Sequence, residues 1–257
     1  MKVVILAGGR GLRINEESQF KPKPMVEIGG YPLLWHIIKL YSKFGFNEFI
    51  ICGGYKQEII RDYFLNFCND DKKSLIDIQN HTISEVETKN SCHLKVTVVD
   101  TGLNTMTGGR IKRIKDLIGD DEEFMITYGD GVSDIDLNDL VKFHHEHKKD
   151  LTITAVQPEG RFGILNINNE SEIIDFKEKE KDPNIWINGG FMVTTKEIFK
   201  YLTGDDCVLE KEPLVKMASE RKISAYKHYG FWRCMDTLKD REDLEQLWNG
   251  GDCPWLK

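Results

Sequence analysis

The sequence lacks the features that mark membrane, secreted and nucleic-acid-binding proteins. No apolar run approaches the roughly 18 residues that a membrane-spanning helix needs. Its 42 acidic residues outnumber its 35 lysines and arginines, giving a net charge of −7, so positive charge for binding nucleic acid is scarce. The first strand pattern begins at Lys2, which leaves no space for a signal peptide. We therefore expect a cytoplasmic protein that binds neither membranes nor nucleic acid.

Cysteine and histidine also lack the spacings of known metal and catalytic sites. The six cysteines form no C-x-x-C pair, so neither a zinc site nor a disulfide framework is indicated, and free thiols are expected. His144, His145 and His147 do not have the H-E-x-x-H spacing and are expected on a solvated or partly packed helix face. No Ser-His-Asp or Cys-His arrangement indicates a covalent intermediate.

Strand and helix patterns alternate through the first 156 residues, as in βαβ units with a parallel sheet. The expected strands are residues 3–6, 48–52, 94–99, 123–128 and 151–156. Shorter extended segments follow, at 164–167, 173–178 and 187–193. The prediction is one α/β domain over residues 1–257, with a Rossmann-like, mostly parallel sheet flanked by helices. Residues 1–156 would form the βαβ half of this domain, and residues 157–257 would close the fold and carry a smaller appended β region suited to a substrate.

Residues 66–93 are the least patterned part of the chain and are rich in Asp, Lys, Ser and Asn. Connections of this length in compact domains are usually functional. We hypothesise that this segment forms a lid or an oligomer contact, and its deletion without loss of assembly or activity would contradict that.

A glycine-rich turn after the first strand is the strongest chemical signal. Gly8, Gly9 and Gly11 can present backbone N–H groups to one anion, and Arg13 and Lys23 add positive charge. No Gly-Lys-Ser/Thr triplet follows, and the third glycine of the dinucleotide fingerprint is missing. The turn therefore predicts a polyphosphate site of another kind. The alternative is a tight turn with incidental surface charges.

Other candidate residues follow the remaining strands, at the sheet edge where ligands of open α/β sheets bind. Asp130 lies between two glycines and is the best candidate ligand for Mg²⁺. Asp236 is the natural second carboxylate, although it could instead cap the next helix. The pair Asp134 and Asp136 resembles the D-x-D motif of glycosyltransferases, but we expect it to open a helix.

The second half of the chain offers residues suited to a sugar phosphate. Glu178 and Asn188 can hydrogen-bond hydroxyl groups, Lys179 can hold a phosphate, and the glycines 189–190 leave bare backbone for a sugar ring. The alternative for the Lys/Glu run is a solvated strand face.

These motifs together resemble, over nearly the whole chain, the sugar-1-phosphate nucleotidyltransferases. The matching motifs are Gly8-Gly9-x-Gly11-x-Arg13, Lys21-Pro22-Lys23-Pro24, Gly129-Asp130-Gly131, Phe176-x-Glu178-Lys179 and Asn188-Gly189-Gly190. Longer segments, at residues 21–30, 100–110, 128–134 and 235–238, are similar to those of members that make CDP-glucose.

The resemblance implies transfer of a cytidylyl group from CTP to α-D-glucose 1-phosphate, with Mg²⁺, in a homo-oligomer. It implies catalytic roles for Arg13 and Lys23 and metal binding by Asp130 and Asp236. It makes residues 1–156 the nucleotide-binding half and residues 157–257 the sugar-binding half. Nucleotide binding would involve Leu6, Gly8, Gly9, Gly11, Gly54, Tyr55, Thr107, Gly108, Arg110 and Asp130. Of these, Gly54, Tyr55, Thr107, Gly108 and Arg110 would surround the base. Sugar-phosphate binding would involve Glu178, Lys179, Asn188 and Gly190.

The chain departs from the family pattern at four places. Leu12 stands where the family usually has threonine, Glu180 where it commonly has proline, and Arg233-Cys234 where Gln-Pro or similar is common. Four alternatives therefore stay open: another sugar 1-phosphate, dTTP or UTP in place of CTP, a non-catalytic nucleotide-sugar sensor, and a glycosyltransferase that uses Asp134 and Asp136.

Overall fold

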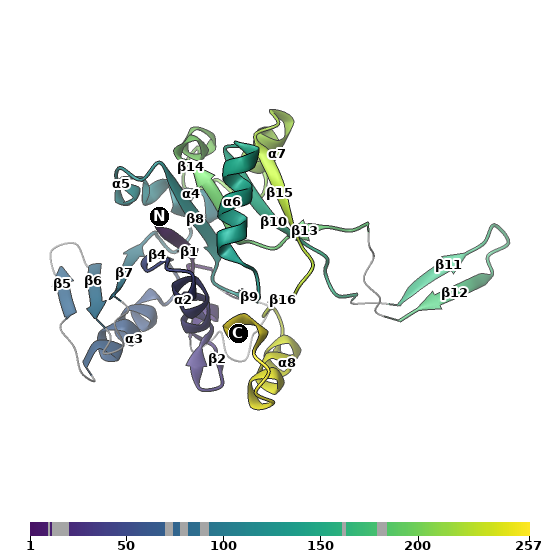
Figure 1. Cartoon of the computed structure of the whole chain (residues 1–257), viewed down its shortest axis with the longest axis horizontal. Helices are drawn as coiled ribbons and strands as arrows, with labels where there is room; N and C mark the ends of the chain where they lie inside the picture. Colours follow the sequence, from purple (N-terminus) through teal and green to yellow (C-terminus); the bar gives the residue numbers. More distant parts are fainter. Residues whose placement is uncertain are drawn as a thin grey trace.

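The fold is built around one large sheet, seen in Figure 1 of the computed structural model. The structure describes residues 1–9, 11, 21–69, 74–77, 82–87, 93–160, 163–178 and 184–257. The main sheet contains ten described strands: β1 (Val3–Leu6), β4 (Glu48–Gly53), β5 (Ser74–Asp77), β6 (Thr82–Glu87), β7 (His93–Asp100), β8 (Glu123–Tyr128), β10 (Leu151–Val156), β13 (Ile187–Asn188), β14 (Met192–Thr195) and β15 (Ile223–His228). Three strand pairs lie outside it: β2 (Glu27–Ile28) with β3 (Tyr31–Pro32), β9 (Gly131–Ser133) with β16 (Trp232–Cys234), and β11 (Ile164–Ile167) with β12 (Ile173–Lys177).

The centre of the sheet is parallel. β1 pairs with β4 on one side and β8 on the other, with Leu6 opposite Cys52 and Tyr128, and β4 continues in parallel to β7. All four residues of β1 are buried, as expected for a strand covered on both faces. The predicted strands at 3–6, 48–52, 94–99, 123–128 and 151–156 are confirmed, and so is the α/β class with a mostly parallel core.

Helices cover both faces of this core. The α-helices of the described residues are α2 (Leu33–Lys43), α3 (Gln57–Asn69), α4 (Thr107–Arg113), α5 (Lys115–Ile118), α6 (Leu137–His147), α7 (Glu212–Ser219) and α8 (Leu238–Asn249), and the short 3₁₀ helices are η1 (Lys23–Met25), η2 (Lys196–Tyr201) and η3 (Pro254–Leu256). Val3 and Ile5 belong to the apolar cluster that contains α2. Val4 and Leu6 point to the other face, in the cluster with α4 and α5. The strict alternation of a strand produces these two cores. None of the described helices is long and apolar enough to cross a membrane.

The second half of the chain contributes to the same sheet. β14 lies between β8 and β10 and is antiparallel to both, while β15 is parallel to β10. The predicted strand over 187–193 divides into β13 and β14, because Gly190 at φ +75° and Phe191 at φ +43° interrupt the extended backbone. The sheet is therefore mixed.

The hairpin β11–β12 projects away from the body of the molecule (Figure 1), and its two strands pair with each other. Its apolar side chains are largely exposed; Phe176, for example, is 58% exposed and Ile174 61% exposed. Within the described residues, this hairpin is the part that matches the predicted appended β region.

The poorly patterned segment 66–93 contains more regular structure than its sequence indicates. β6 pairs antiparallel with β7, and β5 pairs with β6, so the segment extends the sheet at one edge (Figure 1). The neighbouring residues 70–73, 78–81 and 88–92 lie outside the described residues. A role as lid or oligomer contact stays a prediction.

Candidate active site

Two cavities meet where the central strands end. The first, of about 460 Å³, lies against the glycine-rich turn after β1, and the second, of about 780 Å³, lies against β13 and β16. Tyr128, Asp130 and Asp236 line both cavities. The other predicted residues that line the first are Leu6, Gly8, Gly9, Gly11, Lys23, Thr107 and Arg110, whereas Asn188 lines the second. Ligands in the two cavities would therefore approach each other at a pair of carboxylates.

Hydrogen bonds to one of its backbone carbonyls anchor the glycine-rich turn. The carbonyl of Gly8 accepts hydrogen bonds from the N–H of Tyr55, at 3.2 Å, and from Arg110 Nη2, at 3.0 Å. A Cβ at Gly8 would lie 2.1 Å from Arg110 Nη1, so a larger residue there would displace the guanidinium. Gly11 has φ +61° and lines the first cavity. Arg13, the predicted catalytic cation of this turn, lies outside the described residues.

Arg110 is buried, and its described hydrogen bonds go to three backbone carbonyls and one hydroxyl, with no carboxylate among them. Its Nη1 donates to Gly53 O, Thr101 Oγ1 and Gly102 O at 2.7–2.8 Å, in addition to the bond to Gly8 O. Burial lowers its pKa from the usual value. One guanidinium therefore ties together the end of β4 and the chain segments that follow β1 and β7. The family resemblance implied that Arg110 contacts the nucleotide base. In the structure Arg110 lines the first cavity, and its guanidinium forms the four hydrogen bonds described above.

Lys23 lies between the two predicted metal ligands. It follows Pro22 at the start of η1, and its Nζ is 2.7 Å from Asp130 Oδ2 and 2.6 Å from Asp236 Oδ1. Burial opposes its charge, but attraction to Asp130 and hydrogen bonds to both carboxylates outweigh burial, so the pKa of the ammonium is raised. The ammonium therefore pairs with both carboxylates at once.

Two strands place the carboxylates. Asp130 follows β8, and its carbonyl accepts a hydrogen bond of 2.8 Å from Met235 N, next to Asp236. The alternative role of Asp236 as a helix cap is wrong: the N-cap of α8 is Thr237, which forms a capping box with Asp240. The Asp236 side chain is thereby available to point at Lys23. Carboxylate oxygens are ligands that Mg²⁺ prefers.

Cys234 is the third potential ligand at this position. Its Sγ and one oxygen each from Asp130 and Asp236 all lie within 4.8 Å of one another. Burial and the neighbouring Asp130 carboxylate raise the pKa of the Cys234 thiol. In the antiparallel pair of β9 and β16, Cys234 is opposite Gly131, which fixes it beside Asp130.

A chain of hydrogen bonds runs along the boundary of the cavities. Tyr128 Oη donates to Glu210 Oε1 at 2.6 Å and accepts from Asn188 Nδ2 at 3.0 Å. Thr107 Oγ1 donates to the other Glu210 oxygen at 2.7 Å. Burial and the nearby Glu210 carboxylate raise the pKa of Tyr128, which keeps its hydroxyl protonated. The start of α4 is thereby connected to Asn188 in the second cavity.

The predicted sugar-phosphate residues divide into two groups. Asn188 faces the second cavity, and its Oδ1 accepts from Gly190 N at 2.9 Å, which holds Gly190 at its positive φ. Glu178 follows β12 at the base of the projecting hairpin, with its carboxylate near Gly163, and is not among the described residues that line either cavity. Lys179 lies outside the described residues.

Three residues predicted to surround the base have other neighbours in the described structure. Gly54 lies against the Arg110 guanidinium, and Gly108 against Cys207. Tyr55 contributes its N–H to the Gly8 carbonyl. In the described structure none of the three lines either of the two cavities.

The two aspartates of the D-x-D motif have structural roles. Asp136 is the N-cap of α6 and accepts hydrogen bonds from Asn138 N and Asp139 N, as predicted. Asp134 pairs with His228 at 2.9 Å. Neither aspartate lines the two cavities.

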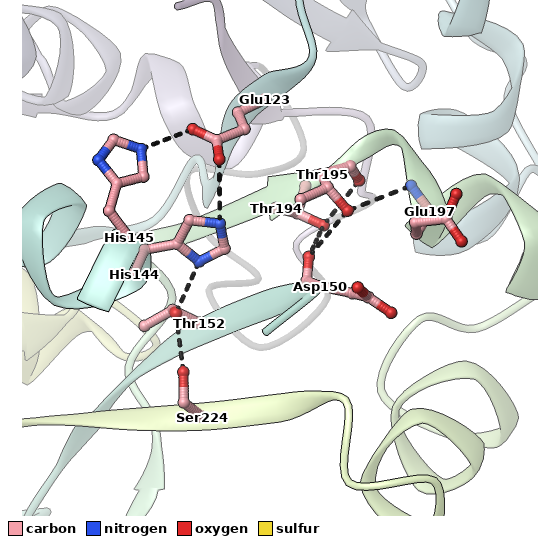
Figure 2. Close-up of polar contacts among 9 residues, drawn as sticks. All are labelled: Glu123, His144, His145, Asp150, Thr152, Thr194, Thr195, Glu197 and Ser224. Carbon is pink, nitrogen blue, oxygen red and sulfur yellow. Dashed lines mark hydrogen bonds and ion pairs between the residues drawn. The ribbon is translucent and has the colours of Figure 1, made fainter. Parts of the chain in front are cut away.

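The histidines of α6 form a partly packed face, as expected. His144 is buried, with Nδ1 at 2.8 Å from Thr152 Oγ1, and Thr152 Oγ1 lies 2.9 Å from Ser224 Oγ (Figure 2). Glu123 is shared with the exposed His145, whose Nε2 lies 2.8 Å from one Glu123 oxygen. Burial lowers the pKa of His144.

Two residues of the boundary, Tyr128 and Glu210, were missed in the sequence. Tyr128 carried a signal, because it ends a predicted strand directly before Gly129 and Asp130. Glu210 carried none: it lies in an irregular segment before α7 and reaches the site only through tertiary packing.

Comparison with known proteins identifies relatives of the whole chain. The profile of the nucleotidyl transferase family matches residues 2–235. A glucose-1-phosphate cytidylyltransferase of Salmonella typhimurium is 45% identical over 261 residues, covering 99% of this chain and 98% of the relative. A probable glucose-1-phosphate cytidylyltransferase of Bacillus subtilis is 40% identical and covers 99% of both chains.

Solved structures of more distant proteins share the fold. HddC from Yersinia pseudotuberculosis, complexed with GMP-PN, has a TM-score of 0.69 at 23% identity, covering 96% of this chain and 99% of that chain. A UDP-glucose pyrophosphorylase complexed with UDP-glucose also has a TM-score of 0.69, at 19% identity, covering 97% of this chain and 98% of that chain. At these identities the likeness establishes the fold.

Proposed function

The chain belongs to the nucleotidyl transferase family and is a nucleotidyltransferase, and we propose that it transfers the cytidylyl group of CTP to α-D-glucose 1-phosphate, releasing pyrophosphate. The family profile and the relatives at 40–45% identity support nucleotidyl transfer as the reaction. The choice of CTP and of glucose 1-phosphate is taken from the names of those relatives. By the same resemblance, we infer that the chain forms a homo-oligomer, which sedimentation would test.

The observation that carries the proposal is the meeting of two cavities at Asp130 and Asp236. CTP is assigned to the cavity at the glycine-rich turn, where backbone N–H groups can face its phosphates. The sugar phosphate is assigned to the cavity that Asn188 lines. Each substrate then presents its reacting phosphate toward the carboxylate pair and Lys23. This arrangement supports direct attack of one phosphate on the other without a covalent intermediate.

The chemistry requires charge neutralisation more than proton transfer. A sugar phosphate has a second pKa of about 6 and is largely a dianion at neutral pH, so its oxygen is already nucleophilic. The barrier comes from bringing two polyanions together, and catalysis is positioning plus electrostatic stabilisation. Lys23 lies in the wall of the first cavity, where it can exchange its carboxylate partners for phosphate oxygens. Arg13 and Lys179 are proposed as the further cations.

The residues at the junction fit a divalent cation. Asp130 and Asp236 hold the Lys23 ammonium between them at 2.6–2.7 Å, so their oxygens already converge on a positive charge. We assign them as the ligands of Mg²⁺. When bound there, Mg²⁺ would neutralise phosphate charge at the reacting centre.

A pyrophosphate-release assay tests the proposal. CTP, dTTP and UTP are each paired with glucose 1-phosphate and with other sugar 1-phosphates in the presence of Mg²⁺. CTP with glucose 1-phosphate is expected to give the highest kcat/KM. A higher value for another pair would correct the substrates and leave the reaction class intact. Binding of CTP with no release from any pair would indicate a sensor, and consumption of a finished nucleotide sugar would indicate a glycosyltransferase.

A further inference from the structure

Cys234 gives the carboxylate pair a ligand that Mg²⁺ does not prefer. Its thiol sulfur lies within 4.8 Å of one oxygen of Asp130 and one of Asp236, and the three side chains are neither fully buried nor fully exposed. All three line the second cavity, so a small ion can reach them from solvent. Mg²⁺ is held by oxygen ligands, whereas thiolate ligands favour softer metals such as Zn²⁺ and Cd²⁺.

Lys23 holds the position that a metal ion bound to both carboxylates would take. Its ammonium occupies the space between the two carboxylates, with Nζ–oxygen distances of 2.6 and 2.7 Å. Because Lys23 holds the charge on a flexible four-carbon stem, a metal ion that binds both carboxylates can displace the ammonium without movement of the strands. The two carboxylates and the sulfur then supply three ligands, and a fourth position stays open, as in many zinc sites.

We propose that Asp130, Cys234 and Asp236 bind a thiophilic divalent cation, of the Zn²⁺ and Cd²⁺ class, which excludes Mg²⁺ and stops nucleotidyl transfer. On binding, the S–H bond of Cys234 breaks, a sulfur–metal bond forms, and the proton passes to solvent. The metal-binding part stands on the geometry of the three residues. The inhibitory part rests on the proposed function, because it requires that Mg²⁺ acts at the same carboxylates.

A titration of the metal-stripped, reduced chain with CdCl₂, in the absence of substrate, tests the binding. The measurement is the ultraviolet charge-transfer absorption of cadmium–thiolate bonds. The wild-type chain is expected to bind one equivalent of Cd²⁺ that the Cys234→Ser variant lacks. Cys253→Ser is the matched control, since Cys253 is a free, partly buried cysteine remote from both cavities and should keep that equivalent. Equal titrations of wild type and Cys234→Ser would overturn the proposal.

A second measurement needs no variant. Alkylation of Cys234 by iodoacetamide is followed by mass spectrometry of its peptide, with and without CdCl₂. Protection of at least about tenfold is expected, since even outer-shell partners of a metal change affinity by that factor. An unchanged alkylation rate at Cys234 would also overturn the proposal.

Turnover separates this inference from the proposed function. With Mg²⁺ present, half-inhibition by Zn²⁺ is expected to need at least about tenfold more metal in Cys234→Ser than in Cys253→Ser. If no substrate pair releases pyrophosphate but the Cd²⁺ equivalent is present, the proposed function fails and the metal site stands. If transfer proceeds and the Cd²⁺ equivalent is absent, the metal site fails and the function stands.

Discussion

Tyr128 and Glu210, which are 82 positions apart in the chain, share a hydrogen bond of 2.6 Å at the boundary between the two cavities. The tyrosine hydroxyl also accepts a hydrogen bond from Asn188, and the glutamate accepts one from Thr107. A single hydroxyl therefore connects the walls of the two cavities, to which we assign the nucleotide and the sugar phosphate.

We expect Tyr128→Phe to lower kcat/KM for the sugar phosphate by about tenfold or more, because a hydrogen bond to a charged group contributes about 1.5–3 kcal/mol. Steady-state kinetics with each substrate in turn would measure this. Tyr201→Phe is the matched control, since Tyr201 donates a bond of the same length, 2.6 Å, to Glu220 on the exposed surface. Equal losses in the two variants would exclude a positioning role for Tyr128.

Asp130→Asn and Arg13→Ala are each expected to lower turnover by at least about 100-fold, the scale for removal of a charged partner of a transition state. Asp136→Asn is the control for the carboxylate, because asparagine also caps helices well and Asp136 is the N-cap of α6. It should leave turnover unchanged. Rates close to wild type in Asp130→Asn would remove the carboxylate pair from the mechanism.

Lys23→Met should tighten binding of Mn²⁺ to the substrate-free chain by roughly fivefold or more. The Lys23 ammonium competes for the same carboxylates, and a charge contact at this distance is worth at least about 1 kcal/mol even in water. The signal of free Mn²⁺ in electron paramagnetic resonance measures the affinity. Lys21→Met serves as the control, since Lys21 Nζ pairs with a different carboxylate, Glu27, at 3.0 Å. Unchanged Mn²⁺ affinity in Lys23→Met would show that the metal binds elsewhere.

Arg110→Lys should cost at least about 2 kcal/mol of unfolding free energy, because one ammonium cannot replace the bonds to Gly8, Gly53, Thr101 and Gly102 and leaves buried acceptors unpaired. Urea denaturation measures the loss, and calorimetry with CTP measures its effect on the cavity. Arg113→Lys, in an exposed pair with Asp205, should change stability by less than about 1 kcal/mol. Loss of CTP affinity at full stability would instead indicate direct contact between Arg110 and the nucleotide.

Stability should fall with acid because of His144. Burial lowers the pKa of this histidine below its usual value of 6.5, so the unfolded state binds a proton more readily than the folded state. The contribution is fully present above pH 6.5 and is lost as pH falls toward the lower folded pKa, with a slope of up to about 1.4 kcal/mol per pH unit. Urea denaturation from pH 7.5 to 5, compared with His144→Asn, measures the slope. His147→Asn, at an exposed position, is the control. Identical slopes in all three proteins would assign the acid sensitivity to other groups.

Much of the fold was predictable because the central strands are buried on both faces. Residues 3–6 and 124–126 are continuous apolar runs, and such runs have few alternatives in a chain with helical patterns between them. The strands at 74–77 and 82–87 escaped prediction because their sequence is polar and they join the sheet only at its edge. The interruption at Gly190 and Phe191 depends on a backbone turn, which the Asn188 side chain stabilises by accepting a hydrogen bond from Gly190 N.

The candidate site was predictable where loops follow parallel strands. Gly8, Asp130 and Asp236 were expected together and line one cavity. The role of Arg110 was harder to predict, since a cation near glycine turns suits either a ligand or the turn itself, and only the structure gives its bonds to backbone carbonyls. Glu210 has no sequence signature, because its importance comes from the tyrosine that packs against it.

The position of β14 has a consequence for synthesis of the chain. Because residues 192–195 pair with β8, the backbone groups along that side of β8 have no sheet partner while the ribosome is still making the preceding part of the protein. Premature release at this stage would leave an exposed strand edge, which promotes aggregation. Truncated products that end before β14 are thus expected in inclusion bodies.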